Sequence, residues 1–185
     1  AMEAFFCGAS HVTHMFNAMA GFHHRQPGLM AAAMDAGASV ELICDGLHVH
    51  PAAVRMAHRL YGDRLDMISD SMRCAGLSDG EYTLGGQAVT VRDGRACLSG
   101  TDTLAGSSIS LLDGVRNYAA FAGVSFGTAV YAATMAPAIE VGLAHEIGSL
   151  EPGKRADLLI LNADGTPAQV MCGGVFCGSA SRGAV

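Results

Sequence analysis

The chain of 185 residues contains no tryptophan, few charged residues and no long apolar run. Only 15% of its residues are charged, and its formal net charge of -6 comes without any stripe of basic residues. This balance argues against a nucleic-acid partner. The longest apolar candidate, residues 29–44, is interrupted by Asp35, Gly37 and Glu41. It therefore falls short of the roughly 18 apolar residues that a membrane span needs.

Two further absences concern the compartment in which the chain works. The beginning of the chain lacks a basic segment followed by an apolar core, so no secretory signal is indicated. The six cysteines include no CxxC pair, which argues against a disulfide framework or a zinc knuckle. We expect reduced, mostly buried thiols in a cytoplasmic protein.

Half of the residues are hydrophobic, and their spacing in the first part of the chain predicts alternating strands and helices. Strands are expected at residues 10–15, 39–44 and 64–68, with one helix opened by Pro27 and a second running from Pro51 to Gly62. Such a β-α-β-α-β run is typical of parallel strands joined by crossover helices. Because the strands lack clean polar alternation, we expect burial on both faces. The residues expected to face the inside of a barrel are Val12, Leu42 and Met67.

The second part of the chain has a different pattern. Residues 79–98 contain two glycine turns between alternating β-formers, which predicts a hairpin. Two helices are expected next, at residues 107–122 and about 126–136. A small β module follows, with strands at 156–161 and 169–172. The small and polar residues 178–185 are expected to be disordered.

Polar side chains follow each of the three predicted parallel strands. His14 comes after the first strand, Asp45 and His48 after the second, and Asp70 after the third. In a (β/α)8 barrel this is the rim on which the active site is built.

The segment around His14 allows two interpretations. Its imidazole is a suitable ligand for Zn²⁺ or Fe²⁺, or it is a hydrogen-bonded histidine in a polar loop. The guanidinium of Arg25, on the loop that follows, matches the geometry of a phosphate group. The neighbouring His23 and His24 are interpreted as surface residues.

The acids after the second and third strands are also open to two interpretations. Asp45 either serves the site together with His48 or caps a turn. Asp70 is placed to act as a general base and then a general acid, with a capping role as the alternative. Residues 104–106 precede Ser107, which we expect to be the N-cap of a helix, and their backbone N–H groups could face a polar substrate.

Six motifs occur in order along the chain: His14 with Asn17-Ala18-Met19, Arg25-Gln26-Pro27-Gly28, Asp45-Gly46-Leu47-His48, Ser69-Asp70, Leu104-Ala105-Gly106-Ser107 and residues 148–158. In order and spacing they resemble the motifs of bacterial N-acetylglucosamine-6-phosphate deacetylases. The resemblance extends to about Phe176, and the first two motifs and the Asp-Gly-Leu-His motif together are specific to that family. The motif at residues 148–158 adds only amidohydrolase-superfamily support.

The resemblance implies an α/β fold, the C-terminal portion of a metal-dependent (β/α)8 amidohydrolase barrel with strands of a small β-sandwich domain. Residues 1–147 would form the partial barrel, with its catalytic loops and a hairpin insertion at about 79–98. Residues 148–177 would supply the strands of the small domain, and 178–185 a tail. The chain is then expected to lack the N-terminal portion of such an enzyme.

The resemblance also implies the chemistry: hydrolysis of N-acetyl-D-glucosamine 6-phosphate to D-glucosamine 6-phosphate and acetate in amino-sugar catabolism. A metal-bound hydroxide would attack the acetamide, with Asp70 as acid/base, His14 as a metal ligand and Arg25 on the phosphate. The metal would be Zn²⁺, with Fe²⁺ as the alternative, and the complete enzyme a cytoplasmic homodimer. The implied substrate-binding residues are Asn17, Ala18, Arg25, Asp45, Gly46, Leu47, His48, Leu104, Ala105 and Gly106.

Two departures from the family pattern leave alternatives open. The family's Glu ligand, a further His ligand and a carbonyl-facing His all precede the region matched here, and Ser69-Asp70-Ser71 replaces the usual Thr-Asp-Ala. One alternative is another amidohydrolase, such as a cyclic-amide hydrolase, against which Arg25 and Asn17-Ala18 argue. The other alternative is a non-catalytic fragment, because only one metal ligand is present.

Overall fold

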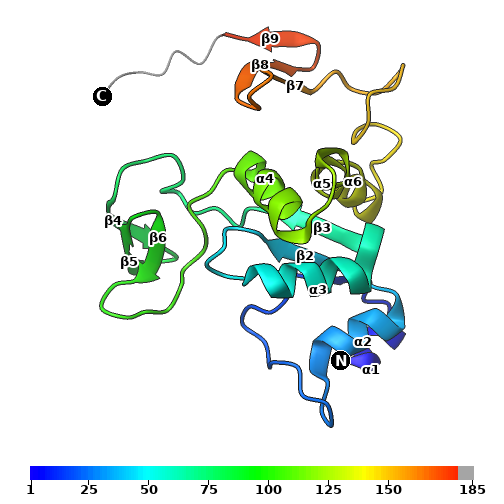
Figure 1. The fold of residues 1–185 in the computed structure, drawn as a ribbon, viewed down its shortest axis with the longest axis vertical. Helices are drawn as coiled ribbons and strands as arrows, with labels where there is room; N and C mark the ends of the chain where they lie inside the picture. The colour runs from blue at the N-terminus through cyan, green and yellow to red at the C-terminus, as the bar shows by residue number, and fades with distance from the viewer. Residues whose placement is uncertain (179–185) are drawn as a thin grey trace.

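The computed structural model describes residues 1–178, which form an α/β arrangement with three separate three-stranded sheets (Figure 1). The elements of the first part are α1 (Met2–Phe6), β1 (His11–Val12), α2 (Gly28–Ala36), β2 (Ser39–Ile43), α3 (Pro51–Tyr61), the 3-10 turn η1 (Gly62–Arg64) and β3 (Leu65–Ile68). Those of the second part are β4 (Gly80–Leu84), β5 (Gln87–Arg92), β6 (Arg95–Leu98), α4 (Leu111–Ala122), α5 (Phe126–Ala133), α6 (Met135–Glu140), β7 (Leu158–Leu161), β8 (Pro167–Cys172) and β9 (Val175–Cys177).

The first sheet is parallel, with the strand order β1-β2-β3, and α2 and α3 form its crossovers. The predicted β-α-β-α-β run is therefore confirmed. Helix α3 begins where expected, since Pro51 occupies its first turn and the His50 side chain accepts a hydrogen bond from the Ala52 N–H. Strand β1 is shorter than predicted, because the backbone leaves the sheet in a turn where His14, Phe16 and Ala18 have positive φ values.

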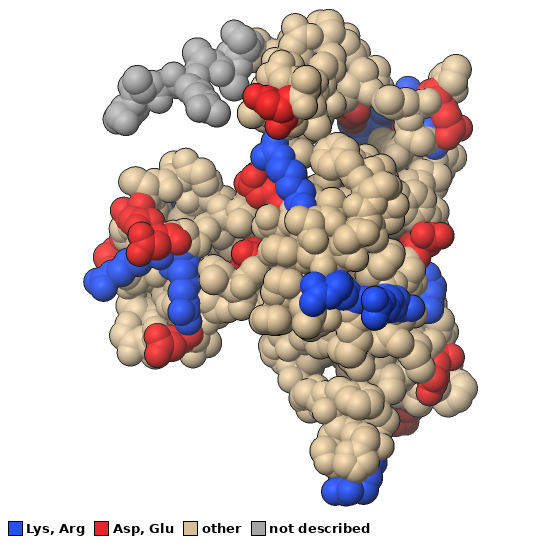
Figure 2. Space-filling model, in the orientation of Figure 1, with Lys and Arg blue, Asp and Glu red and all other residues tan. Residues whose placement is uncertain are grey.

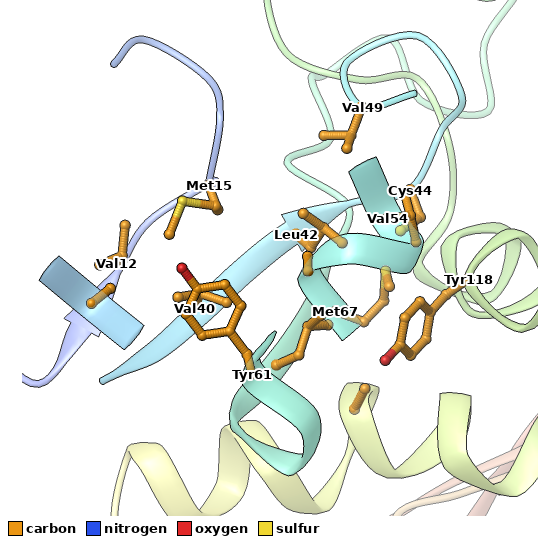
Figure 3. Close-up of a cluster of buried hydrophobic side chains, with 14 of the residues drawn as sticks. Val12, Met15, Val40, Leu42, Cys44, Val49, Val54, Tyr61, Met67 and Tyr118 are labelled. Atoms are coloured by element: carbon orange, nitrogen blue, oxygen red, sulfur yellow. The ribbon is translucent and has the colours of Figure 1, made fainter. Parts of the chain in front are cut away.

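One face of this sheet is covered by helices α3, α4 and α5. The apolar side chains on this face pack with them into the main core, which Figure 3 shows in close-up. Val12, Leu42 and Met67 belong to this core together with helical residues such as Val54 and Tyr118. The prediction that these three residues face the inside of a barrel is therefore wrong, because the helices cover their side of the sheet.

The opposite face of the sheet carries a cluster of ionisable side chains. His11 Nε2 lies 3.1 Å from Glu41 Oε1, and His11 Nδ1 lies 3.7 Å from Asp66 Oδ2 and 3.5 Å from Glu140 Oε1. Burial raises the pKa of Asp66 from 3.8 to about 6; His11 opposes this rise, and Glu140 and Glu41 add to it. The expectation of burial on both faces therefore holds for Ile43 and Asp66 on this face, whereas His11 and Glu41 are only partly buried.

Residues 79–98 form a second sheet, antiparallel, with the order β4-β5-β6, which Figure 1 shows to one side of the first. The predicted hairpin is present, and a third strand extends it. Val89, Val91 and Ala96 are buried in a small core of this sheet that also contains Met72 and Ala105. The sheet is therefore packed against the segments that follow Asp70 and precede α4.

Helix α4 begins later than the sequence predicted. Its N-cap is Ser110, whose Oγ accepts a hydrogen bond from the Asp113 N–H while the Asp113 carboxylate accepts from the Ser110 N–H, a capping box. Ser107 is thus not the N-cap. The second predicted helix is interrupted at Thr134, which separates α5 from α6.

The third sheet is antiparallel, with the order β7-β8-β9. Both predicted strands are present, and β9 adds a third. Arg116 of α4 donates a hydrogen bond to the Gly165 carbonyl in the turn between β7 and β8, which joins this sheet to the helices. Disorder was predicted for residues 178–185. Of these, residues 179–185 lie outside the described residues.

The thiols are less buried than expected. Cys44 and Cys74 are buried and Cys97 is partly buried, whereas Cys7, Cys172 and Cys177 are exposed. The prediction of mostly buried thiols is therefore wrong.

On the face drawn in Figure 2, charged side chains are sparse and most of the surface is uncharged. Within residues 1–178, no helix has both the length and the apolar content to cross a membrane.

Candidate functional site

His14 sits in a turn just beyond β1. Its φ is +34°, in the left-handed region that a residue other than glycine seldom adopts. The turn is fixed by β2, because the Met15 N–H donates to the Glu41 carbonyl (2.9 Å) and the His14 N–H donates to Glu41 Oε2 (3.2 Å). The Asn17 side chain closes the turn by donating to the carbonyls of His14 and Met15, at 3.3 Å each.

The imidazole of His14 has the chemistry of a single metal ligand. Its Nδ1 is buried and has no hydrogen-bond partner among the described residues, an arrangement that costs free energy unless something outside the chain satisfies it. Within residues 1–178 no group of three or more His, Cys, Asp or Glu side chains could hold a metal ion. The described residues therefore fit one ligand of a metal centre and not a complete one.

Arg25 lies on an exposed loop whose conformation is set by two histidines. Its Nη1 is 2.9 Å from His24 Nε2, and its backbone N–H donates to His23 Nδ1 at 3.3 Å. The Gln26 N–H donates to the His23 carbonyl, which closes a tight turn. His23 and His24 are exposed, as expected, and they also orient Arg25.

Asp45 and His48 form a buried pair after β2. Asp45 Oδ1 accepts hydrogen bonds from the N–H groups of Leu47 and His48, at 2.8 Å each, and Oδ2 lies 2.6 Å from His48 Nδ1. Burial acts to raise the pKa of Asp45, but its hydrogen bonds with His48 and Leu47 outweigh that effect, and the pKa falls below its ordinary value.

The capping role of Asp45, which the sequence left open, is therefore confirmed. The same carboxylate also orients the imidazole, because an ionised Asp45 accepts from Nδ1–H of His48 and leaves Nε2 directed elsewhere. The Asn117 side chain donates to the Cys44 carbonyl (2.8 Å) and ties α4 to the end of β2.

Asp70 follows β3, with φ +47°. Its carbonyl accepts a hydrogen bond from the Ser107 N–H (2.8 Å), and the Met72 N–H donates to the Ser107 carbonyl (2.8 Å). The Ser107 side chain donates to the Ser69 carbonyl. The structure therefore brings the segment that contains Leu104 to Gly106 beside Asp70, although the two are far apart in the sequence.

The Asp70 side chain is exposed, and its carboxylate makes no hydrogen bond to other described residues. The described residues therefore do not shield this carboxylate from water. The capping alternative is wrong, because no backbone N–H among them donates to it. The carboxylate is left open to a ligand or to other parts of a larger protein.

Three of the five described residues that have positive φ without being glycine are candidate site residues: His14, Ala18 and Asp70. Strained backbone of this kind is concentrated at active sites and ligand clamps. Nothing in the sequence marks these positions as left-handed. His14, Asp45 and Asp70 all follow parallel strands at one edge of the sheet, but no hydrogen bond or ion pair joins them to one another within the described residues.

Sequence reasoning missed Glu41, which holds the His14 turn, because the segment SVELI of β2 indicated only a buried strand. It likewise missed His24, whose ring contacts the Arg25 guanidinium. No local pattern distinguishes either residue, since both act through contacts that the turns create.

The comparisons with known proteins agree with the motifs. The model of the amidohydrolase family matches residues 1–177. The N-acetylglucosamine-6-phosphate deacetylase of Vibrio furnissii is 41% identical over 158 residues, which are 85% of this chain and 39% of that protein. A putative N-acetylgalactosamine-6-phosphate deacetylase of Escherichia coli K12 is 40% identical over 151 residues, which are 81% of this chain and 90% of that protein.

Among solved structures, an N-acetyl-D-glucosamine-6-phosphate deacetylase mutant from Mycobacterium smegmatis, in complex with N-acetyl-D-glucosamine 6-phosphate, has a TM-score of 0.90 and 36% identity. The match covers 95% of this chain and 47% of that one. The chain thus spans less than half the length of the Vibrio and Mycobacterium proteins.

Proposed function

Because the chain belongs to the amidohydrolase family, we propose that it is the C-terminal part of an N-acetylglucosamine-6-phosphate deacetylase. The complete enzyme hydrolyses N-acetyl-D-glucosamine 6-phosphate to D-glucosamine 6-phosphate and acetate in amino-sugar catabolism. The observation that carries the proposal is the 0.90 TM-score, at 36% identity and over 95% of this chain, to a deacetylase in complex with that sugar phosphate.

The fold proposal is a partial (β/α)8 barrel over residues 1–147, with an insertion at about 79–98, followed by strands of a small β-sandwich domain at 148–177. In support, β1 to β3 are parallel with helices α3 to α5 over one face, and β7 to β9 form a sheet of their own. The outer edges of β1 and β3 have no strand partner among the described residues. Upstream strands of the complete protein would pair with these edges and close the barrel.

Amidohydrolases act with a divalent metal, and we propose Zn²⁺ here, with Fe²⁺ as the alternative. His14 would be one protein ligand, and its orphaned Nδ1 supports an occupant beside the ring. The bound metal would supply Lewis acidity and an activated water. The remaining protein ligands would come from upstream residues of the complete enzyme.

The other residues divide between proton transfer and sugar binding. Asp70, with a carboxylate free of hydrogen bonds to the described residues, would be the acid/base. Arg25 would bind the phosphate, and His48, oriented by Asp45, would donate or accept through Nε2. The remaining proposed substrate contacts are Asn17, Ala18, Gly46, Leu47, Leu104, Ala105 and Gly106. A cytoplasmic homodimer is proposed from the resemblance alone.

A second candidate substrate, N-acetylgalactosamine 6-phosphate, is favoured by one observation, namely the name of the 40% identical Escherichia coli relative. Acetate release by the full-length gene product from both phosphorylated sugars separates the two candidates. We expect a higher kcat/KM for the glucosamine derivative, and a preference for the galactosamine derivative would reverse the assignment. A full-length product inactive on both would leave the non-catalytic alternative.

A further inference from the structure

Glu41 is the residue that fixes the turn carrying His14. Its carbonyl accepts a hydrogen bond from the Met15 N–H (2.9 Å), and its side-chain Oε2 accepts from the His14 N–H (3.2 Å). Two consecutive N–H groups of the turn are therefore held by one residue of β2. Ordinary pairing of β1 with β2 ends earlier, at Val12 and Val40.

The His14 turn needs such support. His14 has φ +34°, Phe16 has φ +78° and Ala18 has φ +52°, all in a region that L side chains avoid. A strained conformation persists only when surrounding contacts over-determine it. Asn17 contributes two hydrogen bonds to carbonyls of the turn, and Glu41 satisfies the N–H of His14 itself.

The Glu41 carboxylate is itself held in place. Its other oxygen, Oε1, lies 3.1 Å from His11 Nε2, and His11 is flanked by Asp66 and Glu140. Glu41 therefore bridges the charged cluster on the open face of the sheet and the turn at the sheet edge. With Oε1 beside His11 and Oε2 bonded to the His14 N–H, the carboxylate gives a fixed acceptor position for that N–H.

We propose that Glu41 is a positioning residue for the metal ligand His14. By holding the left-handed turn, it directs the imidazole, whose buried Nδ1 has no partner among the described residues, toward the metal. Outer contacts that orient a ligating histidine strengthen metal binding. The inference rests on the proposed function, since it presumes that His14 binds the metal.

The test compares Glu41→Ala and Glu41→Gln in the full-length gene product, with Zn²⁺ affinity measured by competition with a chelating indicator. Loss of a group that orients a ligand lowers metal affinity by about 10–100-fold, and we expect this for Glu41→Ala. Glu41→Gln keeps an oxygen for the His14 N–H and should restore the affinity. The matched control is Asp66→Asn, which alters a neighbour of His11 without touching His14.

Hydrogen exchange of the His14 amide provides a readout independent of zinc. We expect slow exchange in the wild type and in Glu41→Gln, and faster exchange in Glu41→Ala. Wild-type zinc affinity in Glu41→Ala, or an equal loss in Asp66→Asn, would overturn the proposal. If Glu41→Ala does not fold, unprotected exchange of the wild-type His14 amide would overturn it, and protected exchange would support it.

A fourth variant, His14→Ala, separates the inference from the function on which it rests. If His14→Ala leaves zinc affinity unchanged, the assignment of His14 as a ligand is wrong. If His14→Ala loses affinity and Glu41→Ala does not, only the role of Glu41 is wrong.

Discussion

Gly106 lies where the segment preceding α4 passes beside the backbone of Asp70, and Gly106→Ala tests this packing directly. A Cβ at this position would lie 2.8 Å from Met72 Cγ and 3.1 Å from the Asp70 carbonyl oxygen. Met72 is buried, and the Asp70 carbonyl is held by the Ser107 N–H, so neither neighbour is free to move away. We expect the substitution to displace Asp70 as well as to destabilise the fold.

The magnitude has two parts. Gly106 has φ +71°, and a left-handed alanine costs about 1–2 kcal/mol. Insertion of a methyl group into a filled site costs about 1–3 kcal/mol more. Gly100→Ala is the matched control, because Gly100 has φ +80° with nothing within 4 Å of the added Cβ. The two variants share the backbone cost and the effect on the unfolded chain, so their difference reports the steric clash.

The assay is urea denaturation of the full-length gene product, with deacetylase turnover measured on the same samples. We expect Gly106→Ala to be about 1–3 kcal/mol less stable than Gly100→Ala, with the m-value unchanged. Turnover should fall in Gly106→Ala alone. Equal stabilities, or full turnover in Gly106→Ala, would refute the packing of Gly106 against Asp70.

Three further predictions concern single side chains of the full-length gene product. Asp70→Asn should lower turnover by about 10²–10⁴-fold with little change in substrate affinity, and a loss below about tenfold would contradict the acid/base role. Arg25→Ala would remove the proposed contact with the phosphate, a charged hydrogen-bond pair worth about 1.5–3 kcal/mol. It should raise KM for the phosphorylated sugar far more than for N-acetylglucosamine, and equal effects would count against phosphate binding. Burial raises the pKa of Asp66 from 3.8 to about 6, although His11 acts to lower this pKa. The folded state therefore favours the protonated acid, and its stability falls as the pH rises through 6. Asp66→Asn should therefore be more stable than the wild type at pH 8, by up to about 3 kcal/mol, and no more stable at pH 4; a pH-independent difference in thermal unfolding would contradict this.

Local patterns predicted the elements whose causes are local. The two strands and the crossover helix from residue 39 to residue 68 follow from apolar runs bounded by Pro51 and Gly62, and both ends of α3 lie where those residues place them. The glycine turns of residues 79–98 likewise predicted antiparallel strands. Such signals act within a few residues, so a single sequence displays them.

Elements set by distant contacts were not predictable in this way. Ser107 and Ser110 are both plausible N-caps, but Ser107 is bonded to the backbone at Ser69 and Asp70, and the capping box with Asp113 selects Ser110. Helix α4 therefore starts at the second serine.

The sequence also could not predict which face of the first sheet packs against the helices. Val12, Leu42 and Met67 alternate with His11, Glu41 and Asp66 along the strands, and only the placement of α3 to α5 decides which set faces the core.

In the candidate site, the sequence singled out the candidate residues but did not indicate how they are held. The link between Asp45 and His48 spans three residues and is accessible to pattern reasoning. The hydrogen bond from the His14 N–H to the Glu41 carboxylate joins residues 27 positions apart and depends on the register of β1 with β2. The left-handed backbone at His14 and Asp70 follows from such tertiary bonds.

The most direct test of the account purifies the 185-residue chain by itself, beside the full-length gene product, and measures bound zinc, oligomeric state and deacetylase activity. Because His14 is one ligand and the described residues hold no cluster of three, we expect the isolated chain to bind no stoichiometric zinc and to release no acetate. Its open sheet edges should make it aggregate or exchange elements with another copy. The full-length product should bind zinc and turn over the sugar phosphate. A monodisperse, zinc-loaded and active monomer of the 185-residue chain would contradict both the partial barrel and the incomplete metal centre.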